Sequence, residues 1–288
     1  MGCVRVMFQW SVTKIHLPQT LNEEAIADEF SVWEQVSFGT AERFTQTPRP
    51  LPCIPVPLPI KIKKDPITMT TPKILYEDPH LLICHKPPGL PVQTKKINTP
   101  DLESILLTYL TSKGEPPYLA VIHRLDQPVE GILVFAKTRE SAKELNAQIQ
   151  NGKMEKYYLA AVSGILKEKE SRLENELIKD AKTNTSRVTR QKTPQSKKAV
   201  LEYRVLKEAE DRSLLEIHLL TGRHHQIRVQ MAYAGHPLLG DTKYNPQAGK
   251  EKEWQYIALC AYKLSFIHPK TKKKMEFQVK PSGNFPIV

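Results

Sequence analysis

The sequence has 288 residues, 40% of them hydrophobic, which is enough to bury the core of one large domain or two small ones. Lys and Arg outnumber Asp and Glu by 42 to 31. Residues 1–66 hold seven of each kind, so the whole excess of 11 positive charges lies in residues 67–288. A basic region of this size predicts a polyanionic partner, either nucleic acid or an acidic membrane surface.

The cysteine and hydrophobic patterns exclude several classes of protein. The four cysteines are scattered without a Cys-x-x-Cys pair, which disfavours a zinc site and a disulfide framework and favours a reducing cytoplasm. No apolar run approaches the roughly 18–20 residues of a membrane-spanning helix. The start, MGCVRVMFQW, fits neither a secretory signal nor a myristoylation site. We therefore expect a cytoplasmic protein without a membrane anchor.

The first part of the chain differs in character from the rest. The stretch LNEEAIADEFSVWEQV has the approximate spacing of a short helix. Six prolines between Pro48 and Pro59 then favour an extended linker, because proline removes backbone donors. We expect residues 1–68 to be a poorly ordered N-terminal extension with a proline-rich linker, and residues 69–288 to be the functional domain.

Predicted strands dominate the second region. Short apolar runs predict strands at 74–76, 81–85, 132–136 and 156–164, and a hairpin over 199–220 that turns at 208–212. The strands outnumber the helices and do not alternate with them regularly. The pattern therefore predicts an α+β fold with a mixed, largely antiparallel sheet flanked by helices and loops.

Three helices are expected among these strands. The first should have Thr99 as its N-cap and Pro100 at its first position, and should end at Gly114. The second, over 138–152, should turn Ala142 and Leu145 inward. A short third helix is expected within 224–236.

Asp126 is the first candidate for chemistry. It follows an arginine and precedes the apolar run GILVF, a place where a carboxylate often only caps a turn. A second feature, LTGRHHQIRVQ, crowds two arginines and two histidines into a turn that opens a helix, and such a site suits a phosphate or a carboxylate. One of these arginines could keep Asp126 ionised, as a nucleophilic carboxylate requires.

Five motifs in order along roughly 73–280 resemble the RluA-type family of RNA pseudouridine synthases. They are KPPGLPV, HRLDQPVEGILVFAKT, KYYLAAVSG, LLTGRHHQIRVQMAYAGHPLLGDTKY and LSFIHP. The resemblance implies a pseudouridine-synthase catalytic domain, an RNA substrate and no cofactor. It does not extend to an N-terminal S4-type RNA-binding domain, because residues 1–68 are charge-balanced and rich in proline.

The resemblance also implies roles for individual residues. The invariant aspartate of the family falls on Asp126, its basic partner on Arg228, the tyrosine that stacks on the target base on Tyr158 rather than Tyr157, and the residue that helps to displace the uridine on Arg124. Two departures put the choice of RNA in doubt. They are Glu130, where many relatives have Ser or Thr, and His224, where relatives have a small hydroxyl residue.

Further RNA contacts are expected around these motifs. The predicted substrate-binding residues are His123, Arg124, Lys156, Arg187, Arg190, Arg223 and Gln226. The two arginines at 187 and 190 belong to a run over 181–201 that has six basic residues, no acid and the composition of a mobile loop suited to phosphates. We assign no histidine a catalytic role and expect no metal site, because the histidines are irregularly spaced and lack carboxylate or cysteine partners.

The sequence thus predicts a monomeric, cofactor-independent isomerase that converts uridine to pseudouridine in structured RNA, with ribosomal RNA favoured over transfer RNA. Asp126 could attack C1′, add to C6 of the base or take a proton from C2′, and the sequence does not separate these routes. Two other functions stay open. One is an RNA-binding protein that has lost catalysis, and the other is a glycoside hydrolase with Glu130 as the second carboxylate.

Overall fold

The computed structural model describes residues 72–96, 98–248, 256–282 and 285–286. The chain divides into two units, Met1–Asp65 and Pro66–Val288, and all the described residues belong to the second. The extension expected over 1–68 lies outside the described residues, so its order and its boundary with the functional domain stay predictions.

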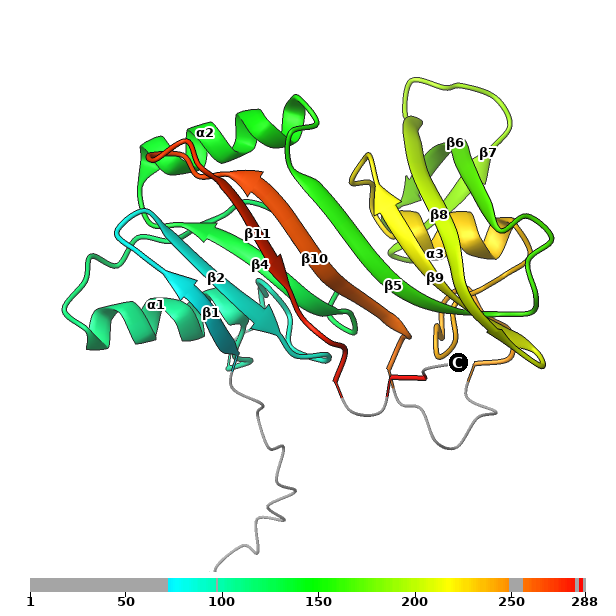
Figure 1. The fold of residues 1–288 in the computed structure, drawn as a ribbon, viewed down its shortest axis with the longest axis horizontal. Helices are drawn as coiled ribbons and strands as arrows, with labels where there is room; N and C mark the ends of the chain where they lie inside the picture. Colours follow the sequence, from blue (N-terminus) through cyan, green and yellow to red (C-terminus); the bar gives the residue numbers. More distant parts are fainter. Residues whose placement is uncertain (1–71, 97, 249–255, 283–284, 287–288) are drawn as a thin grey trace, which may run out of the picture. The chain divides into compact units, whose positions relative to one another are not determined.

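One twisted sheet of eleven strands runs through the described residues (Figure 1). The strands are β1 (Lys73–Glu77), β2 (Leu81–Lys86), β3 (Ala120–Val121), β4 (Glu130–Ala136), β5 (Glu155–Ser163), β6 (Glu170–Asp180), β7 (Thr185–Thr189), β8 (Lys197–Ala209), β9 (Arg212–Leu219), β10 (Leu259–Ile267) and β11 (Lys274–Gln278). Their order is β1-β2-β4-β10-β5-β9-β8-β6-β7, with β3 beside β4 and β11 beside β10. Among these pairs β4 and β10 are parallel and the others are antiparallel. The predicted α+β fold with a mixed, largely antiparallel sheet is confirmed.

Two helices cover opposite faces of the sheet around β2 and β4. Helix α1 (Leu102–Ser112) packs Leu106 with Leu82 and Leu133. On the other face, helix α2 (Arg139–Gln150) packs Leu145 against those residues of β2 and β4 that alternate along the strands with the ones facing α1. They form a separate apolar cluster. Because successive strand residues point to opposite faces, both sets of side chains are buried, and β4 is apolar along most of its length. Figure 1 shows α1 and α2 on the two sides of these strands.

The strands β5 to β9 form the other part of the sheet, in the antiparallel order β5-β9-β8-β6-β7. The third helix, α3 (Gln226–Tyr233), contacts β6 and β7. Its Ile227 and Met231 join Leu215 and Ile217 in the core that also contains the α1 face. The turn before α3 and the loop between β3 and β4 are both anchored on this core, and they carry the residues singled out in the sequence.

Gly131 allows β4 to begin immediately after that loop. Its backbone angle φ is +133°, a value that residues with a side chain rarely adopt. A Cβ atom at this position would lie 2.5 Å from the backbone nitrogen of Ala261. The close approach is the start of the parallel pairing between β4 and β10. The loop that carries Asp126 is therefore attached to a rigid central strand.

Two sequence predictions need correction. The N-cap of α1 is Asp101 and not Thr99, because the Asp101 carboxylate accepts hydrogen bonds from the backbone of both Ser104 and Thr94. The run 181–201 is not wholly a loop, since Thr185–Thr189 forms the edge strand β7. Val188 packs in a small cluster with Leu177 of β6, and this tertiary contact outweighs the polar composition.

Candidate active site

A cleft of about 630 Å³ lies where the β3–β4 loop, β5, the C-terminal end of α2 and the turn before α3 meet. Among its lining residues, all within the described ranges, Asp126 is the one carboxylate. The cations that line the same cleft are Arg124, Lys156, Lys179, Arg223 and Arg228. A single carboxylate among five cations suits the chemistry of a polyanionic substrate.

The backbone on both sides of Asp126 is fixed by hydrogen bonds. The Val129 N–H donates to the Asp126 carbonyl at 3.0 Å, and the Gly89 N–H donates to the Gln127 carbonyl at 2.9 Å. Fully buried Lys86 donates to the carbonyls of Gln127, Leu90 and Pro87 at 2.7–3.0 Å. Burial lowers the pKa of this amine to about 7, while Asp126 acts in the opposite direction. Lys86 thus ties the Lys-Pro-Pro-Gly turn to the loop that carries Asp126, a role that the sequence did not reveal.

Arg228 joins Asp126 to a second carboxylate. Its Nη1 donates to Asp126 Oδ2 at 2.9 Å, while Nε and Nη2 bind Asp241 at 2.9 and 2.7 Å. Both Arg228 and Asp241 are buried. Burial alone would lower the pKa of Arg228, but the bonds to Asp241 raise it, and Asp126 adds to that effect. The two-point bond to Asp241 fixes the guanidinium plane, so Nη1 is held toward Asp126.

His225 is the second group beside Asp126. Its Nε2 lies 3.5 Å from Asp126 Oδ2, and its Nδ1 lies 2.8 Å from the Tyr244 hydroxyl. The Ser186 N–H donates to that hydroxyl oxygen at 2.7 Å, which fixes the hydroxyl beside Nδ1. Burial lowers the pKa of His225 to about 4, with Asp126 opposing it. The ring is therefore neutral near pH 7, with its proton on Nε2 facing the carboxylate.

Both contacts engage the same oxygen of Asp126. Arg228 Nη1 donates to Oδ2, and His225 Nε2 lies 3.5 Å from it. His225 has a φ of 54°, a left-handed conformation that is unusual for a residue other than glycine and is found at functional sites. The start of α3 and the turn before it therefore contact the Oδ2 side of the carboxylate.

Tyr158 presents its ring to the cleft from β5. It is 6% exposed, lines the cleft and belongs to the main apolar core. Burial raises its pKa, so the phenol stays protonated. The neighbouring Tyr157 points to the opposite face of the sheet and stacks on His218, with ring centroids 4.4 Å apart. Strand alternation thus places Tyr158, and not Tyr157, beside Asp126.

The other predicted RNA-binding residues fall into three groups. Arg124, Lys156 and Arg223 line the cleft, as expected for substrate contacts. His123 and Gln226 also line it, but both are engaged by the protein. His123 Nε2 accepts from the Val134 N–H at 3.5 Å, and burial lowers the pKa of this histidine to about 3.

Gln226 is engaged more fully. Its Oε1 accepts from Thr221 and from the Arg223 N–H, and its Nε2 donates to Val200. The side-chain amide therefore holds the turn before α3. We propose that Gln226 shapes the cleft wall and does not bind RNA.

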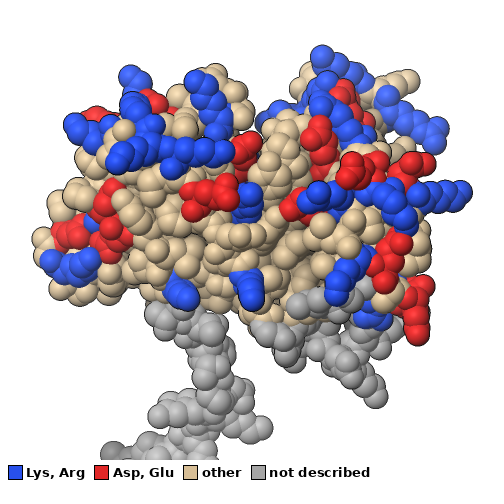
Figure 2. Space-filling view, viewed as in Figure 1, with Lys and Arg blue, Asp and Glu red and all other residues tan. Residues whose placement is uncertain are grey.

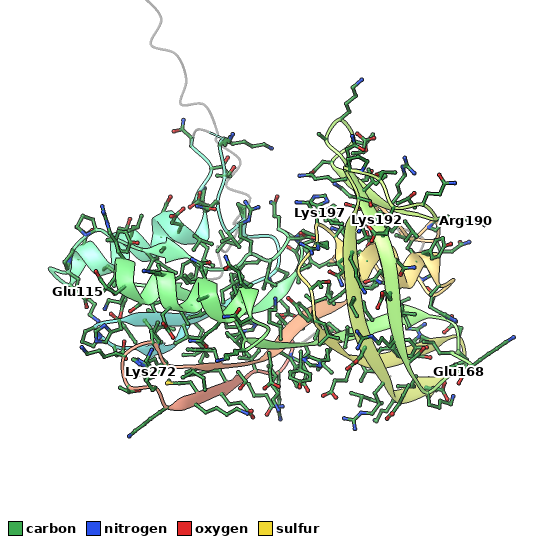
Figure 3. All side chains as sticks on the ribbon, turned by 90° about the horizontal axis from the view of Figure 1, so that it is seen from above. Glu115, Glu168, Arg190, Lys192, Lys197 and Lys272 are labelled. Carbon is green, nitrogen blue, oxygen red and sulfur yellow. The ribbon has the colours of Figure 1, made fainter. Side chains whose placement is uncertain are left out.

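Arg187 and Arg190 are exposed and lie outside the cleft. They stand on β7 and directly after it, and Arg190 lines a separate, smaller hollow that also contains Lys198 and Tyr233. Figure 3 shows Lys197, Lys192 and Arg190 in a row across this part of the molecule. These residues can contact RNA only beyond the cleft that holds Asp126.

The two unusual residues have local partners. His224 stacks on His225 with ring centroids 3.8 Å apart, and its Nδ1 lies 2.9 Å from Ser186 Oγ. Glu130 is buried, accepts from the Ser282 N–H and lies 3.7 Å from His85 Nε2. It does not line the cleft of Asp126, so a hydrolase with these two acids has no structural support.

The described ranges contain no group of three or more His, Cys, Asp or Glu side chains that could hold a metal ion. In the same part of the chain, no helix is long and apolar enough to cross a membrane.

Comparisons with known proteins agree on one family. A family model described as RNA pseudouridylate synthase matches residues 80–233. The uncharacterized RNA pseudouridine synthase YjbO of Bacillus subtilis (strain 168) is 33% identical over 205 residues, which are 71% of this chain and 70% of that protein. The ribosomal large subunit pseudouridine synthase C of Vibrio vulnificus (strain CMCP6) is 31% identical over 236 residues, 77% of this chain and 72% of that one. The solved structure of human RNA Pseudouridylate Synthase Domain Containing 4 has a similar fold, with a TM-score of 0.59 at 23% identity over 73% of this chain and 89% of that one.

Proposed function

The chain belongs to the RNA pseudouridylate synthase family and is an RNA uridine isomerase, and on this premise we propose that Asp126 is its essential residue and that its substrate is ribosomal RNA. The observation that carries the proposal is the position of Asp126. It is the one carboxylate of a cationic cleft, bound on Oδ2 by Arg228 and flanked there by His225.

The reaction breaks the N1–C1′ bond of a uridine, turns the base and joins C5 to C1′, with the hydrogen of C5 released as a proton. We propose that Oδ1 of Asp126 is the reacting oxygen, whichever of the three routes the enzyme follows. Arg228 and His225 would hold the carboxylate oriented before the substrate arrives, which removes a reorganisation cost from the reaction. The product is an isomer of the substrate, so we propose that no cofactor takes part.

The target base must leave its stack to reach Asp126. Extraction costs about a few kcal/mol and is easier from a loop than from a paired stem. We propose that the uracil stacks on Tyr158, an interaction worth roughly 1–3 kcal/mol. Arg124 is exposed and lines the cleft, and we propose that it enters the gap that the base leaves.

The proposed RNA target rests on relatives and on surface charge. The relative from Vibrio vulnificus is named for the large ribosomal subunit, which favours ribosomal over transfer RNA. The exposed cations after β6, among them Arg187 and Arg190, are proposed to contact phosphates around the target loop. A monomeric state and a cytoplasmic location, both expected from the sequence, complete the proposal.

Carbodiimide-based mapping of pseudouridine in total RNA tests this function. Cells with the intact gene, a deletion and an Asp126→Ala version would be compared. We expect one or more ribosomal sites to be lost in both altered strains. Sites that persist in the Asp126→Ala strain but not in the deletion would refute the role of Asp126. A lost site in transfer RNA alone would refute only the ribosomal target.

A further inference from the structure

One sector of the exposed surface of α2 carries cations and amides but no acid. Arg139, Lys143, Asn146 and Gln150 are all exposed and follow one another at intervals of four, three and four residues. At about 100° per residue they fall within about 60° of one another around the helix. Glu140, also exposed, and Glu144 lie outside this sector. We call these four residues, together with exposed Lys153 just beyond the helix, the α2 stripe.

The stripe leads into the active-site cleft. Gln150, at the C-terminal end of α2, is one of the cleft-lining residues, and Lys153 precedes β5, the strand that carries Tyr158. Figure 2 shows Lys and Arg side chains gathered along the upper edge of the molecule on both sides of a notch, over α2 on one side and over β6 to β8 on the other. A molecule seated in the cleft would therefore meet cations on two walls.

The cations of the stripe lack acidic partners. Within the described ranges, no carboxylate lies within 4 Å of the charged groups of Arg139, Lys143 or Lys153, and Glu144 pairs with Lys272 instead. Some exposed cations elsewhere are paired, as in Lys169–Glu208 and Arg204–Glu216, so what sets the stripe apart is the alignment of its cations on one helix beside the cleft. Unpaired cations aligned on one rigid helix are available for phosphates, while the surface pairs satisfy each other.

We propose that the α2 stripe binds the phosphate backbone of a double-stranded RNA stem next to the loop whose uridine enters the cleft. The inference rests on the proposed function and specifies its substrate as a stem-loop. From Arg139 to Lys153 the stripe extends about 21 Å, if the helical rise is continued to its end. Its side chains suit phosphates and 2′-hydroxyls, which are the groups that an A-form stem displays.

A single-stranded flank fits the stripe less well. Single strands are bound through aromatic side chains that stack on successive bases, interleaved with cations. The exposed residues of the α2 stripe are Arg, Lys, Asn and Gln, with no aromatic side chain among them. The side chains can contact a backbone of fixed geometry but offer no platform for unpaired bases.

The test compares RNA binding by two charge-matched variants of the full chain. Arg139→Gln with Lys143→Gln removes two cations from the stripe, and Gln keeps the helix because its propensity is similar. The control, Lys167→Gln with Lys207→Gln, removes two exposed lysines near Glu168, which Figure 3 shows far from α2. The probes are an RNA hairpin of about 12 base pairs with a uridine-rich loop, and a single-stranded oligouridylate.

We expect the stripe variant to raise the Kd for the hairpin about tenfold and to reduce the slope of log Kd against log salt by about two, because each lost phosphate contact releases about one counterion fewer. The Kd of the control variant for the hairpin, and the Kd of the stripe variant for oligouridylate, should each change less than about threefold. The inference is overturned if the Kd of the stripe variant for the hairpin changes no more than that of the control variant. It is also overturned if the wild-type protein does not bind the hairpin. If the stripe variant loses as much affinity for oligouridylate as for the hairpin, the assignment of the stripe to a double-stranded stem is overturned.

The outcomes separate this inference from the proposed function. Binding is read without turnover, in the Asp126→Ala background as well as in the wild type. If wild-type protein makes pseudouridine while the stripe variant binds the hairpin normally, only the inference fails. If stripe-dependent binding occurs but RNA keeps all its uridines, the proposed function fails and the binding surface stands.

Discussion

Helices α2 and α3 flank the same cleft but are built on different principles. In α2 the apolar Leu145 is buried and the charged residues are exposed. In α3 six consecutive residues, from Gln226 to Met231, are buried, and three of them are polar or charged. In α2 the charged side chains face outward and the buried polar residues are uncharged, whereas α3 buries a charged arginine that is paired with two carboxylates.

The difference fits the roles that we propose for the two helices at the cleft. A helix that positions a catalytic carboxylate has to bury charge, and a buried charge is tolerated only when it is paired and hydrogen-bonded. Arg228 meets this condition through Asp241 and Asp126. A helix that contacts a mobile polyanion needs its cations exposed, as those of α2 are. Arginine is thus buried and paired in α3, on one wall of the cleft, and exposed in α2, on the other.

The largest effect is expected for Arg228→Met. Asp241 would be left buried without its cation, which costs about 3–5 kcal/mol of stability, and Asp126 would lose its main partner. We expect isomerase activity to be abolished and the urea midpoint to fall. Near-normal stability would show that the pair with Asp241 does not hold α3 in place.

Leu145→Ala makes the corresponding change in α2. Removing this fully buried side chain should destabilise the fold by about 2–5 kcal/mol. Because Leu145 does not line the cleft, we expect kcat to stay close to the wild-type value at temperatures where the variant is folded. Urea denaturation and single-turnover kinetics give the two numbers. A selective loss of kcat in the folded variant would contradict the division of roles between the helices.

Tyr244→Phe should have a smaller effect that is confined to the α3 wall. The change removes the hydroxyl that accepts from Ser186 and donates to His225, at a cost of about 1–3 kcal/mol for the groups left unpaired. We expect kcat to fall about tenfold, equivalent to about 1.4 kcal/mol, with RNA affinity unchanged. Equal losses in kcat and in affinity would mean that Tyr244 acts on the binding of RNA and not on the orientation of His225.

The pH dependence of stability gives the smallest predicted difference. The pKa of His225 falls from its ordinary value of 6.5 to about 4 in the folded protein, so between these values the unfolded chain binds more protons. Its contribution to stability is complete above pH 6.5 and is lost as the pH falls toward 4. Urea denaturation from pH 7 to pH 4 should show a steeper decline for the wild type than for His225→Gln. Parallel curves would refute the burial of a neutral imidazole, since His123 titrates equally in both proteins.

The two helices also show what the sequence could predict. The spacing of apolar residues in α2 predicted the helix and its inward face, because amphipathic burial leaves a pattern of period 3.6. The pairing of Asp126 with Arg228, 102 residues apart, came from the family resemblance and not from any local pattern.

The partners of α3 were not predictable in the same way. Ser186 and Tyr244 are 58 residues apart, and their contact exists only because β7 is a strand where the composition predicted a loop. Asp241 and Lys86 lie within the motifs that resemble the family, but the sequence did not indicate that they are buried, because single charged residues in turns are usually solvated. Their burial is set by the tertiary fold, which a local reading of the sequence does not contain.

We propose that Asp126 performs the isomerisation while the rest of the cleft binds RNA. The most direct test is tritium release from RNA labelled at C5 of uridine, because C5 loses its hydrogen when it joins C1′. Wild-type protein and Asp126→Asn would be compared at equal RNA occupancy, measured by filter binding. We predict release by the wild type and none above background by Asp126→Asn, with RNA bound equally well by both. Tritium release by Asp126→Asn at a rate close to that of the wild type would contradict the account.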